Sequence, residues 1–133
     1  MNVEARRLEL RDTRFNNPHG LMDERNTSSA YDMARLTFFC WDHGVFRKVV
    51  GTKMRRGVQL DCLGEETTLL WENTNKLLSR SSGWVGGKTG ITFKAGPCLM
   101  SVNRLFIVVL LSSRTMDHRW SEAQALDTYA QTL

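Results

Sequence analysis

The stretch GGKTGITFKAGPCLMSVNRLFIVVLL, residues 86–111, decides the fold of this chain. Its apolar and β-branched residues predict three extended segments, at residues 87–93, 97–102 and 104–112. Residues 94–96 separate the first two segments, and a tight turn at residues 102–103 separates the last two. Connections this short join neighbouring antiparallel strands, so the stretch predicts an antiparallel meander.

The last of these segments is apolar from Leu105 to Leu111 and shows no alternation with polar residues. A strand of this kind is covered on both faces. It also needs a neighbour along each edge, because a long apolar edge strand promotes aggregation. The meander supplies one neighbour only. We therefore expect a second segment, from outside these residues, to pair beside Leu105–Leu111.

Helices are predicted before and after the meander in the sequence. The first of them is short and lies at residues 2–9. Ser29 and Asp32 have the spacing of a capping box, and Ser121 and Gln124 open a final helix in the same way. The apolar positions expected on the buried faces of these two helices are Ala30, Met33, Ala34, Thr37, Phe38 and Trp41, and Ala123, Leu126, Ala130 and Leu133. The expected fold class is α+β, an antiparallel sheet flanked by helices.

The rest of the chain gives weaker signals. Between residues 52 and 71 there are hints of short strands at residues 59–63 and 69–71. The length of 133 residues and a hydrophobic content of 41% fit one domain, residues 1–133, with a modest core. We find no internal repeat and no linker.

Charge and cysteine content exclude several classes of protein. The 18 Lys and Arg residues exceed the 14 Asp and Glu residues by four, but they are scattered, so no nucleic-acid partner is predicted. Cys40, Cys62 and Cys98 contain no C-x-x-C and are interpreted as buried free thiols. Cys40 and His43 have a ligand-like spacing without a second pair, so neither a metal site nor a cofactor is expected.

The first ten residues, MNVEARRLEL, carry charges where a signal peptide has an apolar run. No apolar run reaches the length of a membrane-spanning helix. The sequence therefore predicts neither a signal peptide nor a membrane span within these residues.

The motif GGKTG contains the Gly-Lys-Thr core of a phosphate-binding loop, but the rest of that pattern does not fit. The loop requires a glycine five residues before Gly87, where the sequence has Ser82, and Gly83 misses the spacing by one position. The residues that follow also predict a strand, whereas a phosphate loop opens a helix. A lysine and a threonine on a strand edge can instead hold a substrate carboxylate, and a glycine beside them lets the substrate backbone approach.

Four motifs carry a resemblance along nearly the whole chain: FNNPHGL (15–21), SSAYDMA (28–34), NTNKLL (73–78) and GGKTGITFKAGPCLMS (86–101). In order and spacing they resemble the low-molecular-mass penicillin-binding proteins, which are serine-type D-alanyl-D-alanine carboxypeptidases with a beta-lactamase/transpeptidase-like fold. The resemblance implies peptidoglycan peptide trimming and penicillin binding, in a family that works outside the cytoplasm, in the periplasm or cell envelope.

The resemblance also implies roles for individual residues. Lys88 and Thr89 would bind the terminal carboxylate of a D-Ala-D-Ala peptide or of a β-lactam. Gly90 would keep the strand edge open. The backbone N–H of Ile91 would be a donor of the oxyanion hole. No metal and no cofactor are implied.

The family's nucleophile motif S-x-x-K does not occur in residues 1–133, and its S-x-N motif is matched only at Ser101-Val102-Asn103. We interpret this match as part of a turn. The resemblance thus predicts a partial domain, without the amino-terminal strands and the nucleophile helix, that is inactive alone. A chain or segment supplying that half would pair beside Leu105–Leu111. The alternative hypothesis is a non-catalytic subunit derived from the family, docked in a larger assembly.

Overall fold

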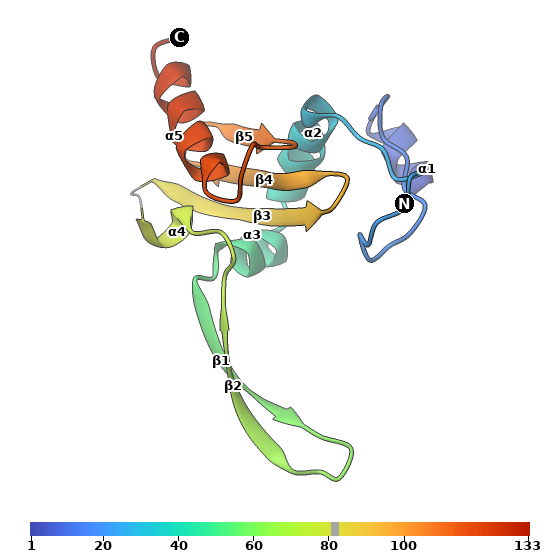
Figure 1. Ribbon diagram of the computed structural model, residues 1–133, viewed down its shortest axis with the longest axis vertical. Helices are drawn as coiled ribbons and strands as arrows, with labels where there is room; N and C mark the ends of the chain where they lie inside the picture. Colours follow the sequence, from blue (N-terminus) through green and yellow to red (C-terminus); the bar gives the residue numbers. More distant parts are fainter. Residues whose placement is uncertain (81–82) are drawn as a thin grey trace.

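In the computed structural model, residues 1–80 and 83–133 are described. The helices and strands of these residues are α1 (Asn2–Arg7), α2 (Ala30–Trp41), α3 (Gly44–Gly51), β1 (Met54–Leu60), β2 (Glu66–Glu72), α4 (Leu77–Arg80), β3 (Trp84–Thr92), β4 (Gly96–Asn103), β5 (Ile107–Leu110) and α5 (His118–Ala130) (Figure 1). They form a three-stranded sheet in the order β3-β4-β5 and a separate two-stranded hairpin, β1-β2. The α+β class, with an antiparallel sheet flanked by helices, is confirmed.

The meander predicted from the sequence is present. β3 pairs with β4 and β4 pairs with β5, both antiparallel. The second turn lies slightly later than predicted, because the Asn103 side-chain oxygen accepts from the N–H groups of Leu105 and Phe106 and closes the turn there. Ser101 lies inside β4 and is fully buried, so its interpretation as a turn residue was wrong.

Helices cover β5 on both faces, as the apolar run predicts. Val108 belongs to the core cluster with Trp120 and Ala123 of α5, whereas its neighbour Val109 faces a hollow lined by α2. Side chains of a strand alternate between faces, so α2 and α5 lie on opposite sides of the sheet (Figure 1). The strand is shorter than the apolar run, and Leu105 lies before it, 76% exposed. Within the described residues β5 pairs with β4 alone.

Helix α2 begins where the sequence predicts, but its capping box is only half formed. The Ser29 side chain accepts from the Asp32 N–H at 3.2 Å. The Asp32 carboxylate, 1% exposed, instead accepts from the Asp12 N–H at 2.8 Å and the Thr13 hydroxyl at 2.7 Å. It therefore fixes the amino-terminal segment to α2. Phe38, predicted on the buried face, is 64% exposed.

Asp32→Ala is expected to lower the free energy of unfolding by about 2–3 kcal/mol, because two donors lose a buried acceptor. Denaturant unfolding measures this loss. Asp42→Ala, at the exposed carboxyl end of the same helix, is the matched control and should change little. Equal stability of the Asp32 and Asp42 variants would contradict a structural role for the Asp32 carboxylate.

Helix α5 begins one turn earlier than predicted. The Thr115 hydroxyl accepts from the His118 N–H, which starts the helix at His118, so Ser121 lies inside it. The buried side chains are consequently Arg119, Trp120 and Ala123. Leu126 and Leu133 are exposed instead of buried, because the helix extends past the sheet toward the carboxyl terminus (Figure 1).

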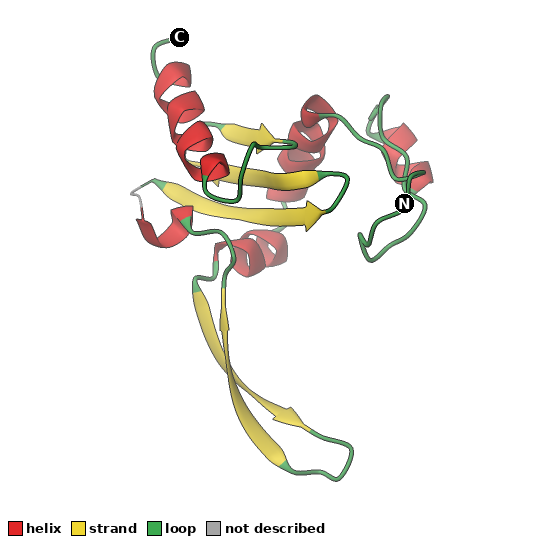
Figure 2. Cartoon of the chain, viewed as in Figure 1, coloured by secondary structure: helices red, strands yellow, loops and turns green. Residues whose placement is uncertain are grey.

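The hairpin β1-β2 is more extensive than the two short strands hinted at in the sequence, and α3 and α4 were not predicted. Figure 2 shows the hairpin extending away from the sheet and helices. Nearly all of its residues are exposed. The Trp71 ring covers Gly57 so closely that a Cβ there would come within 2.4 Å of it. This contact explains how a glycine in a strand can still contribute to packing.

The three cysteines are free, but they are not uniformly buried. Cys40 and Cys98 are half-buried, and partial burial raises the pKa of the Cys40 thiol. Cys62 is exposed, so the expectation of a buried thiol was wrong there. Among the described residues no three potential ligands form a metal cluster, and no helix is long and apolar enough to cross a membrane.

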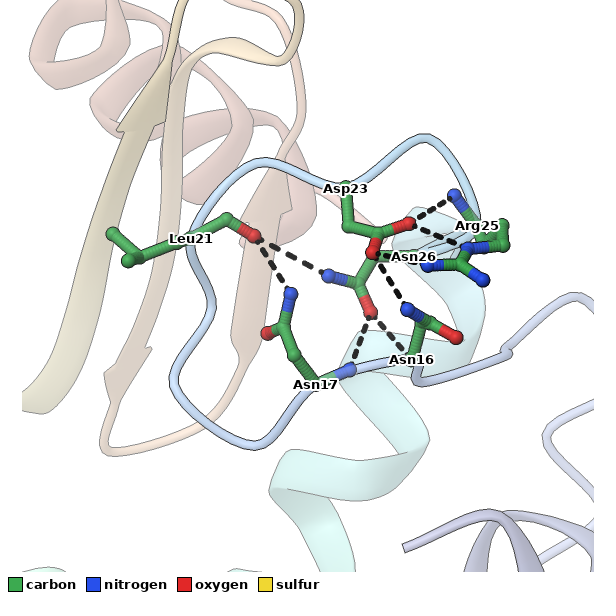
Figure 3. A network of polar contacts seen from close by, with 6 residues as sticks. All are labelled: Asn16, Asn17, Leu21, Asp23, Arg25 and Asn26. Atoms are coloured by element: carbon green, nitrogen blue, oxygen red, sulfur yellow. Dashed lines mark hydrogen bonds and ion pairs between the residues drawn. The ribbon is translucent and has the colours of Figure 1, made fainter.

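A polar network holds the loop around the Asn-Pro-His-Gly motif (Figure 3). The Asn26 side-chain oxygen accepts from the N–H of Asn16 at 2.6 Å, and Asn17 donates to the Leu21 carbonyl at 3.0 Å. The Asp23 carboxylate accepts from the Arg25 side chain, from the Arg25 N–H and from Asn16. A loop without regular structure is thereby fixed by its own side chains.

The Arg25 side-chain hydrogen bonds, followed by the Arg25 backbone N–H, lower the pKa of Asp23 far below its usual range. The network is therefore intact above the ordinary aspartate range and is lost only as the pH falls through the lowered value. Arg25→Gln is expected to raise the pKa of Asp23 toward that of an ordinary aspartate.

The measurement is an NMR titration of the Asp23 carboxyl carbon. Arg14→Gln is the control, because Arg14 bonds Thr27 through its backbone and not through its side chain. An Asp23 pKa that does not change in the Arg25 variant would contradict the assignment of the shift to Arg25.

Candidate functional site

The Lys-Thr-Gly motif lies on β3, a strand at the edge of the three-stranded sheet. Lys88 and Gly90 are exposed, and Thr89 is buried. The Lys88 ammonium donates to the carbonyl oxygen of Thr89. The cation therefore folds back along its own strand and lies beside the threonine that follows it.

The hydrogen-bonding direction of β3 follows from its partner strand. The carbonyl of Pro97 accepts from the Ser113 N–H, so this carbonyl faces the β5 side of β4. The backbone N–H and C=O groups of successive residues in an antiparallel strand point to alternate edges. The backbone groups of Cys98 therefore point toward β3, where Cys98 pairs with Gly90. The N–H groups on either side of Gly90, those of Thr89 and Ile91, consequently point away from β4. In the described residues this edge of β3 has no strand partner.

The glycines of β3 differ in the space around them. A Cβ added to Gly87 would lie 2.4 Å from the Met100 carbonyl oxygen and 2.7 Å from the Asn75 amide nitrogen. A Cβ added to Gly90 would meet no atom within 4 Å. Gly87 is therefore required by packing inside this chain. Packing within the described residues gives no reason for a glycine at position 90.

The segment Asn73-Thr74-Asn75 supports the motif from outside the sheet. The hydroxyls of Thr74 and Thr89 share a hydrogen bond of 2.6 Å. Asn75, 1% exposed, donates to the Ser101 hydroxyl at 3.0 Å, and Ser101 in turn donates to the Gly86 carbonyl at 3.2 Å. The sequence identified this segment only as part of a family pattern, and it gave no indication that Thr74 contacts Thr89.

An apolar hollow of about 330 Å³ opens beside the motif, between α2 and the sheet. Lys88, Thr89 and Gly90 form part of its lining. The remaining lining residues are Met33, Leu36, Thr37, Cys40, Phe46, Cys98, Leu99, Met100, Val109 and Leu111. The hollow continues to the carboxyl end of β5, so it joins the motif to the strand whose second edge lacks a partner among the described residues.

A larger hollow of about 750 Å³ lies elsewhere, between the amino-terminal loop and the turn after β3. Lys94 in that turn forms an ion pair with Glu24 across it. The hollow does not include Lys88, Thr89 or Gly90. We therefore place the candidate site at the smaller hollow, where the motif lies.

A second cation, which the sequence reasoning missed, lies close to this part of the sheet. Arg119 of α5 is 5% exposed and donates to the Cys98 carbonyl at 3.3 Å. Its guanidinium also stacks over the Trp120 ring, 4.4 Å from the ring centroid. Its Nε atom has no hydrogen-bond partner among the described residues.

The structure thus brings Lys88, Thr89, Gly90 and the Ile91 N–H together on β3, at a strand edge that is unpaired among the described residues. It does not bring Ser101 or Asn103 there. The Ser101 hydroxyl is buried against Gly86 and Asn75, and Asn103 lies at the far end of β4, where its side chain donates to Asp127. The interpretation of Ser101-Val102-Asn103 as part of a turn thus holds for Asn103, which closes the turn after β4, and not for Ser101.

The model of the D-alanyl-D-alanine carboxypeptidase family matches residues 1–112. The D-alanyl-D-alanine carboxypeptidase of Streptomyces sp. (strain K15) is 30% identical over 138 aligned residues, which cover 100% of this chain and 47% of that protein. The D-alanyl-D-alanine carboxypeptidase DacF of Bacillus subtilis (strain 168) is 34% identical over 136 residues, which cover 98% of this chain and 33% of that protein. The chain therefore spans between a third and a half of the length of these relatives.

Solved structures show the same partial coverage. The Streptomyces K15 DD-transpeptidase superposes with a TM-score of 0.92 at 31% identity, over 99% of this chain and 52% of that one. A D-alanyl-D-alanine carboxypeptidase from Mycobacterium tuberculosis H37Rv has the same fold, with a TM-score of 0.83 at 22% identity. The superposition covers 99% of this chain and 52% of that one. The predicted partial transpeptidase-like fold is confirmed by these superpositions.

Proposed function

Because the chain belongs to the D-alanyl-D-alanine carboxypeptidase family, we propose that it supplies the substrate-binding half of a serine-type D,D-peptidase site. The substrate is a peptide ending in D-Ala-D-Ala, and a β-lactam occupies the same place. One observation carries the proposal. The Lys88 ammonium, the Thr89 hydroxyl and the outward N–H of Ile91 belong to neighbouring positions of β3, whose outer edge has no strand partner in the described part of the chain.

The chemistry of these groups suits a peptide carboxyl terminus. Lys88 and Thr89 bind the terminal carboxylate through charge-assisted hydrogen bonds, which are stronger than hydrogen bonds between neutral groups. The N–H of Ile91 donates to the scissile carbonyl as its oxygen becomes negative, in the manner of an oxyanion hole. Gly90 leaves the edge open for the substrate backbone, which is consistent with the free space around it.

The nucleophile has to come from outside these 133 residues, because they contain no Ser-x-x-Lys. We propose that a segment or second chain carrying this motif pairs along the open edge of β5, beside Leu105–Leu111. The apolar hollow between α2 and the sheet supports this arrangement, because Val109 and Leu111 line it together with Lys88 and Thr89. Closure of the hollow excludes water and strengthens the charge contacts inside it.

The test is to label native source material with a fluorescent penicillin and to purify the species that contains this 15.2 kDa chain. We expect the label on a polypeptide segment that carries Ser-x-x-Lys and that co-purifies with this chain. Labelling of residues 1–133 themselves would contradict the proposal, because the nucleophile would then lie in this chain. Absence of any labelled segment in the purified species would favour the alternative, a non-catalytic subunit in a larger assembly.

A further inference from the structure

The hydroxyls of Thr74 and Thr89 form a hydrogen bond of 2.6 Å in which either oxygen could be the donor. Among the described residues, the Thr89 hydroxyl has no other hydrogen-bond partner. The Lys88 ammonium binds the Thr89 carbonyl, not the hydroxyl. A hydroxyl group has one proton to donate and two lone pairs to accept with. The function of Thr89 toward an anion therefore depends on which of the two hydroxyls donates in this pair.

Only one of the two arrangements suits a carboxylate. A carboxylate accepts hydrogen bonds and has none to donate. If Thr89 donates to Thr74, its lone pairs face the anion. If Thr74 donates to Thr89, the Thr89 proton is free to point at the anion, and the two hydroxyls and the carboxylate form a cooperative chain of hydrogen bonds.

The backbone around Thr74 is held firmly enough to fix this contact. Asn73 donates to the carbonyls of Val50 and Thr52, at 3.2 and 3.0 Å, and its side-chain oxygen accepts from the Asn75 N–H at 2.9 Å. Asn75 is anchored on the other side through Ser101. Thr74 thus lies between two asparagines that are each tied to different parts of the fold.

The Thr89 side chain also needs this contact to keep its orientation. A threonine in a strand can exchange its methyl group and its hydroxyl by rotation about χ1. The bond to Thr74 favours the rotamer in which the hydroxyl points toward Thr74. Loss of the Thr74 hydroxyl removes that preference without changing the charge of the site.

We propose that Thr74 is a positioning residue that orients the Thr89 hydroxyl as a donor toward the substrate carboxylate. This inference rests on the proposed function, and it adds to the site a residue outside the Lys-Thr-Gly strand. Thr74 does not touch the substrate and acts through Thr89. Its effect is therefore specific to ligands with an anionic terminus.

The test is an amide NMR titration of the assembled protein, isotope-labelled in the 133-residue chain, with two probes, N-acetyl-D-Ala-D-Ala and its C-terminal carboxamide. The quantity measured is the ratio of the two dissociation constants, which reports recognition of the carboxylate and is insensitive to a general loss of binding. We expect Thr89→Val to reduce the preference for the carboxylate about tenfold or more, because the Lys88 ammonium is then the remaining contact to the carboxylate. Thr74→Val should reduce the preference about threefold to tenfold, the effect of one neutral hydrogen bond.

Thr74→Ser keeps the hydroxyl and should restore the preference of the unsubstituted chain. Thr74→Ala is the second variant, in case the added methyl group of valine disturbs the fold, and should behave as Thr74→Val does. Thr68→Val, at an exposed position of the hairpin strand β2, is the control and should leave the ratio unchanged.

The outcomes separate the two proposals. A reduced ratio in Thr89→Val with an unchanged ratio in Thr74→Val and Thr74→Ala would overturn the role of Thr74 and leave the proposed function standing. An unchanged ratio in Thr89→Val, or the absence of binding by the unsubstituted assembled protein, would overturn the proposed function and the inference with it.

Discussion

Acylation by a β-lactam is expected to slow by a factor of about 10 to 1000 when Lys88→Ala is introduced into the assembled protein, the effect of removing one preorganised charge contact. The Lys88 ammonium lies against the Thr89 carbonyl, on the edge where the substrate carboxylate is proposed to bind. No other residue of β3 carries a positive charge that could replace it. The measurement is the second-order rate constant for labelling with a fluorescent penicillin.

Lys94→Ala is the matched control for charge. Lys94 lies in the turn after β3 and pairs with Glu24 at the larger hollow, away from the motif. Its removal changes the net charge by the same amount and should leave the labelling rate within about twofold, because exposed ion pairs contribute little. Full activity of the Lys88 variant would count against the substrate-binding proposal, and equal losses in both variants would indicate a general effect of charge.

Gly87→Ala is expected to lower the free energy of unfolding by about 2–3 kcal/mol, a cost typical of overpacking a rigid site. The added methyl group would meet the Met100 carbonyl oxygen at 2.4 Å, and backbone in the middle of a paired strand cannot move aside cheaply. The same methyl group would press on the Asn75 side chain, which links β4 to the segment that carries Thr74. Denaturant unfolding of the 133-residue chain measures the loss.

Gly90→Ala provides the matched control, three positions along the same strand. Its methyl group meets nothing within 4 Å in this chain, so the free energy of unfolding should stay within about 0.5 kcal/mol of the unsubstituted value. The open space at Gly90 is proposed to receive substrate, so the variant should bind N-acetyl-D-Ala-D-Ala more weakly although it is equally stable. If Gly87→Ala proved as stable as Gly90→Ala, the close packing described for Gly87 would be wrong.

The sequence predicted those parts of the fold whose signals are local. The turns after β3 and β4 and the apolar run of β5 were sufficient to predict the meander, and Ser29 marked the start of α2. The Lys-Thr-Gly motif was recognisable because three adjacent residues carry its chemistry. Its position on an edge strand agrees with the prediction.

The parts that were missed depend on contacts between distant residues. The spacing of Ser29 and Asp32 is that of a capping box, but the Asp32 carboxylate accepts from donors 20 and 19 positions earlier, at Asp12 and Thr13. The hairpin β1-β2 shows little alternation, because both of its faces are exposed and no core selects apolar residues on one side. The bond between Thr74 and Thr89 spans 15 positions and leaves no periodic pattern in the sequence.

The hairpin β1-β2 is expected to unfold at a lower free energy than the sheet and its helices. Its strands pair with each other, and a two-stranded ribbon with exposed faces is only marginally stable in water. It can therefore open and reclose while the sheet and its helices remain folded, as a cooperative unit of its own. The buried indoles of Trp84 and Trp120 report on the sheet, and the half-exposed indole of Trp71 reports on the hairpin. A single unfolding temperature for the whole chain would average two events that these fluorophores can separate.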